Sequence, residues 1–299
     1  MTERAAKFDV LQVERRDILG EGPWWDVDDQ RLWWVDIKGH LIRNATLDGT
    51  EGNTIETASD VGFAVPDSEG GVFAGLRDGL YRRTAAGVWT QTWKGDYDTS
   101  AHRINDGKTD RTGRIWFGTM QDTENAPLSG FYCYSASGVE WQFGEITTSN
   151  GLGWSPDELT FYYTDSPARL IWAFDFDPEA GSATNRRVFA EDPAGYVPDG
   201  LTVDADGAVW AAKWDGGKVV RYSPNGDIDF ELTLPVRRPT SAMFVGPDLS
   251  TLAVTSANLD PADGELAGAV FLIATETSGI PEVRAQVSPE GRPEPNLIR

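Results

Sequence analysis

The sequence predicts an all-β fold, a six-bladed β-propeller whose blades are four-stranded antiparallel sheets. Its 299 residues include 32 glycines, 17 prolines and 12 tryptophans, and stretches with helical periodicity are scarce. Short runs of aromatic and β-branched residues alternate with turns of the Asp-Gly type, which is typical of antiparallel strands. The third observation is a pattern that repeats along the chain at the spacing of a propeller blade.

The repeat consists of a short strand, a turn of the form D-x-x-G or S-P-D, and a strongly apolar strand. We define the first turn residue of each copy as its anchor, which gives Asp26, Asp67, Asp110, Ser155, Asp204 and Gly246. Consecutive anchors lie 41 to 49 residues apart, close to the length of a four-stranded blade, about 40–45 residues. Six copies fill the chain without a linker, so we expect one propeller domain over residues 1–299.

The remaining strands follow from the same repeat. A third strand is expected after the apolar strand at residues 130–135, 170–177 and 218–224. The ring of blades has to close on itself, and closure removes exposed sheet edges. We expect the N-terminal segment 8–17 to supply a strand to the last blade.

Equivalent positions on the innermost strands of a propeller converge on its central channel. The positions five residues before the anchors are Glu21, Gly62, Asn105, Asn150, Asp199 and Ser241. Five of these six residues carry a side-chain oxygen, where an ordinary strand would place packing residues. Arg103 lies two residues before Asn105, and the period of two in a strand points both side chains to the same face.

The chemistry of this set predicts a divalent cation in the channel. Two carboxylates and two amide oxygens, without a histidine or thiol, are ligands for hard cations such as Ca²⁺, Mg²⁺ or Mn²⁺. Two carboxylates crowded together without a cation repel each other. The alternative is that these polar side chains only line a water-filled channel. If one divalent metal ion is bound, its identity stays open among Ca, Zn, Mn, Mg and Fe.

Longer motifs around these positions resemble a known family. They are LGEGPWWD (19–26), LWWVDIK (32–38), RINDGKTDRTGRIWFGTM (103–120), TTSNGLGWSPDELTFYYTDS (147–166) and PDGLTVDADGAVWAA (198–212). Over residues 17–256 the chain resembles the SMP-30/gluconolactonase/LRE family, also called regucalcin-like. The resemblance implies a six-bladed propeller with one catalytic divalent metal that hydrolyses sugar lactones.

The resemblance also implies roles for five residues. Glu21, Asn150 and Asp199 are expected to bind the metal, and Asp199 is expected to accept the proton of the attacking water. Arg103 and Asn105 are expected to hold the substrate. The predicted activity is the metal-dependent opening of aldonolactones to aldonic acids, as in a gluconolactonase.

Several alternative functions stay open. One is a lactonase specific for a pentonolactone, such as xylono- or arabinonolactone. Another is a non-catalytic, calcium-binding protein like regucalcin, which would use the same ligands without turnover. A propeller phosphotriesterase and a protein-binding scaffold are the remaining two.

Composition excludes several other classes. Asp and Glu outnumber Lys and Arg by 47 to 26, for a formal net charge of −21, so nucleic acid is not an expected partner. Cys133 is the one cysteine, which excludes an intrachain disulfide. No apolar run approaches the about 18 residues of a membrane helix, and the first ten residues lack a signal-peptide core. We therefore expect a cytoplasmic protein without membrane partners, a monomer or weak homo-oligomer that binds a small sugar lactone.

The other notable residues have simpler explanations. For His40 and His102 we expect turn or packing roles, although His102 is the neighbour of Arg103. DADG (204–207) resembles the start of a calcium-binding loop, but its glycine falls at position 4 instead of 6, so a strand-to-strand turn is expected. The segments 98–102 and 121–130 are expected to border the pocket. Six tryptophans in the repeated strands are expected to pack between blades rather than stack on sugars: Trp24, Trp25, Trp33, Trp34, Trp116 and Trp210.

Overall fold

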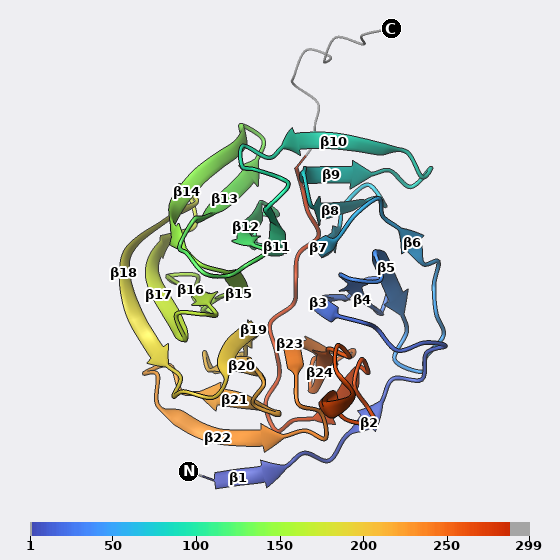
Figure 1. The fold of residues 1–299 in the computed structure, drawn as a ribbon, viewed down its shortest axis with the longest axis vertical. Helices are drawn as coiled ribbons and strands as arrows, with labels where there is room; N and C mark the ends of the chain where they lie inside the picture. The colour runs from blue at the N-terminus through green and yellow to red at the C-terminus, as the bar shows by residue number, and fades with distance from the viewer. Residues whose placement is uncertain (1, 288–299) are drawn as a thin grey trace, which may run out of the picture.

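The computed structural model describes residues 2–287 and confirms the six-bladed propeller, with six sheets arranged around a central axis (Figure 1). Residue 1 and residues 288–299, which the one-domain prediction includes, lie outside the described part of the chain. Apart from two N-terminal strands that join the outer edges of the last two sheets, the first strand of each blade in sequence lies innermost, at the axis.

The six blades follow one another in sequence order. Blade 1 contains β3 (Gly20–Asp26), β4 (Arg31–Asp36), β5 (Leu41–Ala45) and β6 (Ile55–Glu56), and blade 2 contains β7 (Val61–Pro66), β8 (Val72–Leu76), β9 (Gly79–Arg83) and β10 (Trp89–Lys94). Blade 3 contains β11 (His102–Thr109), β12 (Ile115–Gln121), β13 (Ser129–Ser135) and β14 (Gly138–Ile146), and blade 4 contains β15 (Ser149–Trp154), β16 (Thr160–Asp165), β17 (Leu170–Asp177) and β18 (Ser182–Glu191). Blade 5 contains β19 (Val197–Val203), β20 (Val209–Trp214), β21 (Lys218–Tyr222) and β22 (Ile228–Thr233), and blade 6 contains β23 (Pro239–Val245), β24 (Thr251–Ser256) and β25 (Phe271–Ala274).

The N-terminal segment closes the ring as expected. Within residues 8–17, β2 (Asp9–Val10) pairs antiparallel with β25 and becomes the outermost strand of blade 6. A second N-terminal strand was not expected: β1 (Thr2–Ala5) pairs in parallel with β22, so blade 5 has five strands. A short 3₁₀ helix, η1 (Pro261–Asp263), lies between β24 and β25. The part of the chain that the structure describes contains no helix with the length and apolar character needed to span a bilayer.

The anchor aspartates explain why the turn pattern repeats. In the blades anchored by Asp26, Asp67, Asp110 and Asp204, the buried carboxylate accepts backbone N–H bonds from the turn that follows it. Each of these carboxylates also binds an arginine. An aspartate at this position therefore accepts the hydrogen bonds of the backbone N–H groups in the turn and links the turn to an arginine of a neighbouring segment. The DADG sequence is such a turn, as expected.

We expect Asp204→Ala to lower the free energy of unfolding by about 3–5 kcal/mol, because it leaves several buried donors without an acceptor and removes one of the carboxylates that bind Arg221. The carboxylate accepts the indole N–H of Trp210 at 2.8 Å, the guanidinium of Arg221 at 2.8 Å and the N–H of Ala208 at 2.9 Å. Urea unfolding measures the change. The matched control is Asp206→Ala, because the Asp206 side chain in the same turn is 71% exposed; equal losses for the two variants would contradict this account.

A C-terminal segment, residues 278–287, crosses the axis after blade 6 (Figure 1). It forms backbone bridges with blade 5 at Asp204 and with blade 2 at Asp67. Its Arg284 binds Asp26 of blade 1, and its Glu282 lies 3.0 Å from Lys108 of blade 3. These contacts involve the ends of the innermost strands, so the segment covers one end of the channel and leaves the other end for a ligand.

Candidate active site

A cavity of about 270 Å³ lies at the end of the channel where the innermost strands begin. Its lining includes all five of the predicted site residues: Glu21, Arg103, Asn105, Asn150 and Asp199. Arg103 and Asn105 open into it together, as the strand period predicts. The other lining residues are Leu19, Ile37, Lys38, Met120, Asp122, Glu124, Thr148, Ser166, Val197, Trp214 and Leu259.

The innermost strands share a β-bulge at or beside the position five residues before the anchor. The pairing register shifts there in all six strands, for example at Asn105 in β11 and after Asn150 in β15. A bulge leaves one residue unpaired and turns its side chain out of the regular alternation. This explains why polar side chains at one repeat phase reach the channel.

Two positions of the same phase do not contribute to the large cavity. Ser241 lines a smaller space further along the channel. Gly62 has no side chain to offer, because a Cβ atom there would lie 2.5 Å from the backbone oxygen of Asn105. The close approach of β7 and β11 therefore requires glycine at this position.

Glu21 and Asp199 are two buried carboxylates in this cavity, 8% and 3% exposed. Burial, together with the negative charge of Asp106, raises the pKa of Glu21 to about 8. Burial and the charge of Glu21 raise the pKa of Asp199 well above its ordinary value. Oδ1 of Asp199 is buried without a hydrogen-bond partner among the described residues. The ionised forms of both carboxylates are therefore unfavourable unless a positive charge in the cavity compensates them.

The two amides present oxygen atoms beside these carboxylates. Nδ2 of Asn150 donates to Oγ of Ser166 at 3.0 Å, and Nδ2 of Asn105 donates to the backbone oxygen of Ser149 at 2.7 Å. With their nitrogen atoms held in this way, both side chains keep their carbonyl oxygens available. Glu21, Asn150 and Asp199 therefore fit a hard divalent cation. Among residues 2–287 no group of three or more His, Cys, Asp or Glu side chains forms a metal site, so the ligand set named here relies on an amide oxygen beside the two carboxylates.

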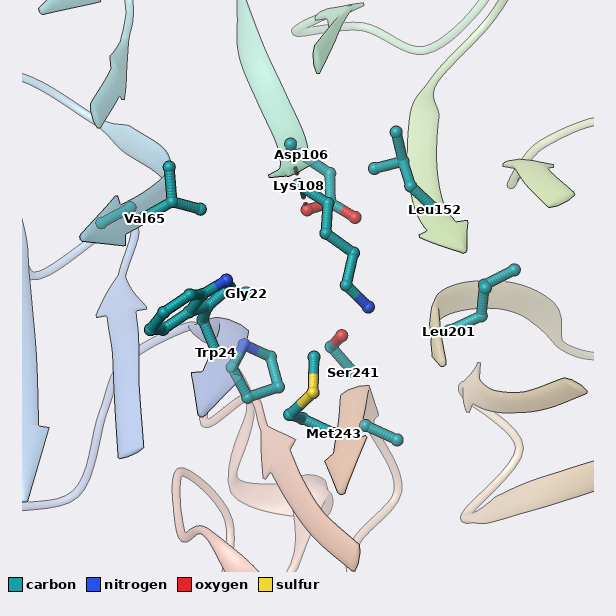
Figure 2. Close-up of a pocket in the computed structure, with 13 residues that line it drawn as sticks. Gly22, Trp24, Val65, Asp106, Lys108, Leu152, Leu201, Ser241 and Met243 are labelled. Atoms are coloured by element: carbon teal, nitrogen blue, oxygen red, sulfur yellow. Dashed lines mark hydrogen bonds between the residues drawn. The ribbon is translucent and has the colours of Figure 1, made fainter. Parts of the chain in front are cut away.

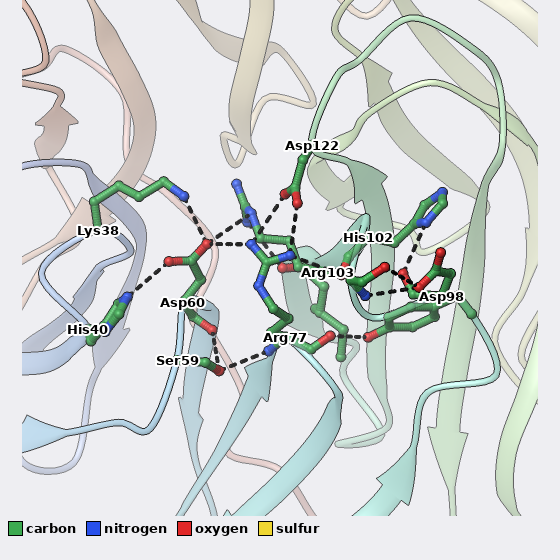
Figure 3. Close-up of polar contacts among 12 residues, drawn as sticks. Lys38, His40, Ser59, Asp60, Arg77, Asp98, His102, Arg103 and Asp122 are labelled. Atoms are coloured by element: carbon green, nitrogen blue, oxygen red, sulfur yellow. Dashed lines mark hydrogen bonds and ion pairs between the residues drawn. The ribbon is translucent and has the colours of Figure 1, made fainter.

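Arg103 is held at the cavity by a cluster of charges around Asp60 (Figure 3). Asp60 accepts hydrogen bonds from Lys38 at 2.8 Å and Arg77 at 2.9 Å, and it contacts Nε2 of His40 at 3.0 Å. Nε of Arg103 lies 3.8 Å from the same carboxylate.

The hydrogen bonds of Arg103 leave part of its guanidinium available. NH1 of Arg103 donates to the backbone oxygen of Ile104. Burial lowers the pKa of Arg103, and Asp60 opposes that shift. The guanidinium therefore stays charged, with donors left for a ligand.

We expect Asp60→Asn to lower the free energy of unfolding by about 1–3 kcal/mol near neutral pH, because the charge-assisted bonds are lost. Burial alone would raise the pKa of Asp60, but Lys38, Arg103 and Arg77 lower it from 3.8 to about 2. A lowered carboxylate pKa gives stability that is complete above the unfolded pKa and is lost as the pH falls through the folded pKa. Urea unfolding from pH 6 to pH 2 should show the two proteins converging below about pH 4; a constant difference over that range would contradict the assignment.

Several residues of the site were not predicted from the sequence. Asp106 follows Asn105 directly, and regular alternation would point it away from the channel, but the bulge lets it line the smaller space beside Lys108 (Figure 2).

The two segments expected to border the pocket differ in outcome. Asp122 and Glu124 of the segment 121–130 do line the large cavity, whereas the lining contains no residue of the segment 98–102.

The histidines and the six tryptophans named above take no part in the cavity lining. His40 contacts Asp60, and Nδ1 of His102 contacts the backbone oxygen of Asp98. This agrees with the turn and packing roles expected for them. Trp214, which the repeat did not single out, is the tryptophan in the lining.

Comparison with known proteins gives a consistent result. The model of the family described as SMP-30/Gluconolactonase/LRE-like region matches residues 19–258. A pentonolactonase of Haloferax volcanii is 34% identical over 281 residues, which cover 90% of this chain and 95% of the relative. A 6-deoxy-6-sulfogluconolactonase of Pseudomonas putida is 34% identical over 282 residues, covering 90% and 96%. The crystal structure of the calcium-binding protein regucalcin from Agrobacterium tumefaciens superposes with a TM-score of 0.89 at 28% identity, covering 96% of this chain and all of that one.

Proposed function

The chain belongs to the SMP-30/gluconolactonase/LRE-like family, and from this premise we propose that it is a metal-dependent hydrolase that opens sugar lactones to aldonic acids. The observation that carries the proposal is the pair of buried carboxylates, Glu21 and Asp199, in one cavity with Arg103. Buried negative charge suits a cation, and a neighbouring guanidinium suits the oxygen atoms of an ester. Relatives with lactonase names at about one-third identity support the same reaction class.

The cation would be held by Glu21, Asn150 and Asp199. When bound, a divalent cation supplies Lewis-acid chemistry toward a carbonyl oxygen. Calcium has the support of the similar regucalcin structure, which is that of a calcium-binding protein. Zn, Mn, Mg and Fe are the other candidates, because cellular availability as well as ligand type decides which ion a site holds.

The chain's own groups account for the remaining steps. Oδ1 of Asp199, which has no hydrogen-bond partner in the described residues, is the atom that takes a proton from water as the water oxygen attacks the lactone carbonyl. Arg103 donates to the oxyanion that develops, and the free oxygen of Asn105 accepts from a sugar hydroxyl. The bond between the carbonyl carbon and the ring oxygen then breaks. The leaving oxygen takes up the proton, which completes an open-chain aldonic acid.

A substrate panel tests the proposal. Purified protein supplied in turn with Ca²⁺, Mn²⁺, Zn²⁺, Mg²⁺ and Fe²⁺ is assayed for acid release from glucono-, xylono- and arabinonolactone, and from a phosphotriester. We expect turnover of lactones and not of the phosphotriester. The hexono- and pentonolactones distinguish a gluconolactonase from a pentonolactonase. Saturable calcium binding without any lactone turnover would overturn the enzymatic proposal in favour of a non-catalytic calcium-binding protein.

A further inference from the structure

One half of the cavity carries most of its apolar side chains, although the charged Glu21, Lys38 and Asp199 come from the blades of that same half. Its apolar side chains come mainly from blades 5, 6 and 1, which are neighbours in the ring: Val197, Trp214, Leu259, Leu19 and Ile37. The polar and charged side chains of blades 3 and 4 line the opposite half: Arg103, Asn105, Asp122, Glu124, Thr148, Asn150 and Ser166. A ring with hydroxyl groups at its edge and C–H groups on its faces matches such a cavity.

Trp214 is the aromatic residue of the apolar half. It ends β20 and pairs across the sheet with Val197, which lines the same cavity. Its side chain packs against the buried cluster that contains Leu19 and Ile37. The indole is therefore backed by core residues and still borders the cavity, where it is partly exposed.

Arg238 packs against this ring. Its guanidinium carbon lies 5.0 Å from the centre of the Trp214 ring, in cation–π geometry. Nε of Arg238 donates to Asp215 at 2.8 Å, and NH1 donates to the fully buried Asp263 at 3.2 Å. Arg238 is not part of the cavity lining, so the ring surface it covers is not the surface that borders the cavity.

The indole N–H of Trp214 differs from those of the structural tryptophans. Trp34, Trp116 and Trp210 each donate their indole N–H to a buried aspartate. Trp214 makes no such hydrogen bond within residues 2–287, and its nitrogen is not among the buried, unpartnered atoms that include those of Trp24 and Trp25. Among the described residues, the indole of Trp214 is therefore not committed to a structural hydrogen bond.

We propose that Trp214 is the platform on which the C–H face of the substrate ring packs, with Arg238 as its positioning residue. This rests on the proposed function, because it takes the ligand to be a sugar lactone. The platform sets the ring flat against blades 5, 6 and 1 and turns its hydroxyl groups toward Asn105 and Arg103. Aromatic stacking of this kind contributes to binding in the ground state and the transition state alike, so it affects KM rather than kcat.

The test measures hydrolysis of D-glucono-1,5-lactone and calorimetric binding of the non-hydrolysable D-glucono-1,5-lactam in the metal-loaded protein. For Trp214→Leu we expect KM and the Kd of the lactam to rise about tenfold, with kcat within about threefold, from the loss of one stacking contact. Trp214→Phe keeps an aromatic surface and should recover most of the affinity. Trp141→Leu is the matched control, because Trp141 is 62% exposed and lies outside the cavity; it should bind like the wild type.

Two further measurements separate a platform from a merely structural residue. Lactam should change the tryptophan fluorescence of the wild type and of Trp141→Leu but not of Trp214→Phe. Arg238→Lys, which keeps a cation beside Asp215 and Asp263, should bind the lactam more tightly than Arg238→Met at equal Tm.

The two proposals fail in distinguishable ways. Unchanged lactam affinity in a folded Trp214→Leu protein would overturn the platform while leaving the lactonase proposal intact. A wild type that hydrolyses no lactone and binds no lactam would overturn both.

Discussion

Replacing Asp199 with Asn is expected to lower kcat about 10²–10⁴-fold, the range for loss of a general base. Asparagine keeps the size of the side chain and one oxygen atom, but it cannot take a proton from water. Metal affinity should fall as well, because one of the two carboxylates facing the cation is gone. Steady-state kinetics at saturating metal and metal titration measure the two effects separately.

A second expectation for Asp199→Asn concerns the Tm of the metal-free protein, and it would not hold if Asp199 had a purely structural role. Burial and the nearby charge of Glu21 raise the pKa of Asp199, which means that its ionised form is unfavourable in the folded protein. Asp199→Asn should therefore leave the Tm of the metal-free protein at least as high as that of the wild type. Near-normal kcat at saturating metal would place the base elsewhere and contradict the mechanism.

Asn105→Ala is the matched comparison, since Asn105 lies in the same cavity and both carboxylates stay in place. It removes an oxygen assigned to a substrate hydroxyl, so KM should rise while metal stays bound. Loss of a neutral hydrogen bond is worth about 0.5–1.5 kcal/mol, or roughly a 2–10-fold change. Loss of metal from Asn105→Ala would instead assign this residue to the cation.

The fold could be predicted because the repeated pattern comes from contacts between residues that lie close together in the sequence of each blade. An anchor such as Asp110 satisfies its own turn and binds the indole N–H of Trp116 six residues later, so the signal recurs within each blade. The parallel strand β1 has no such signal. Residues 2–5 gain their strand geometry only from pairing with β22, more than 220 residues away in the chain, and a contact of that kind leaves no periodic pattern in the sequence.

The site could be predicted in part, for an equally physical reason. One position of the repeat supplies four of the site residues: Glu21, Asn105, Asn150 and Asp199. A β-bulge at this position in each innermost strand directs these side chains into the channel. The sequence did not predict that Asp106 also faces the channel, because a regularly alternating strand directs consecutive residues such as Asn105 and Asp106 to opposite faces. The bulge breaks this alternation. Trp214 and Glu124 lie beyond the innermost strands, at the end of β20 and in the segment after β12, where the repeat phase carries no information about the cavity.

Removal of the cation is expected to abolish lactone turnover and to lower the Tm, with both recovered on adding back the ion that the site holds. The reason is the charge in the cavity: Glu21 and Asp199 are buried together, and Asp106 adds to the repulsion. An ion at a hundred times its Kd stabilises the folded state by about 2.7 kcal/mol, which for a domain of this size is a rise in Tm of roughly 4 °C. Exhaustive chelation tests this expectation. Differential scanning calorimetry and activity measurements follow for the wild type and Glu21→Gln.

Glu21→Gln should show a much smaller change in Tm on adding back the ion. Asp206→Asn is the control, because Asp206 lies in an exposed turn at the opposite ends of the innermost strands; its change in Tm should equal that of the wild type. Turnover that survives chelation, or a Tm that no divalent ion changes, would mean that the two carboxylates serve without a metal.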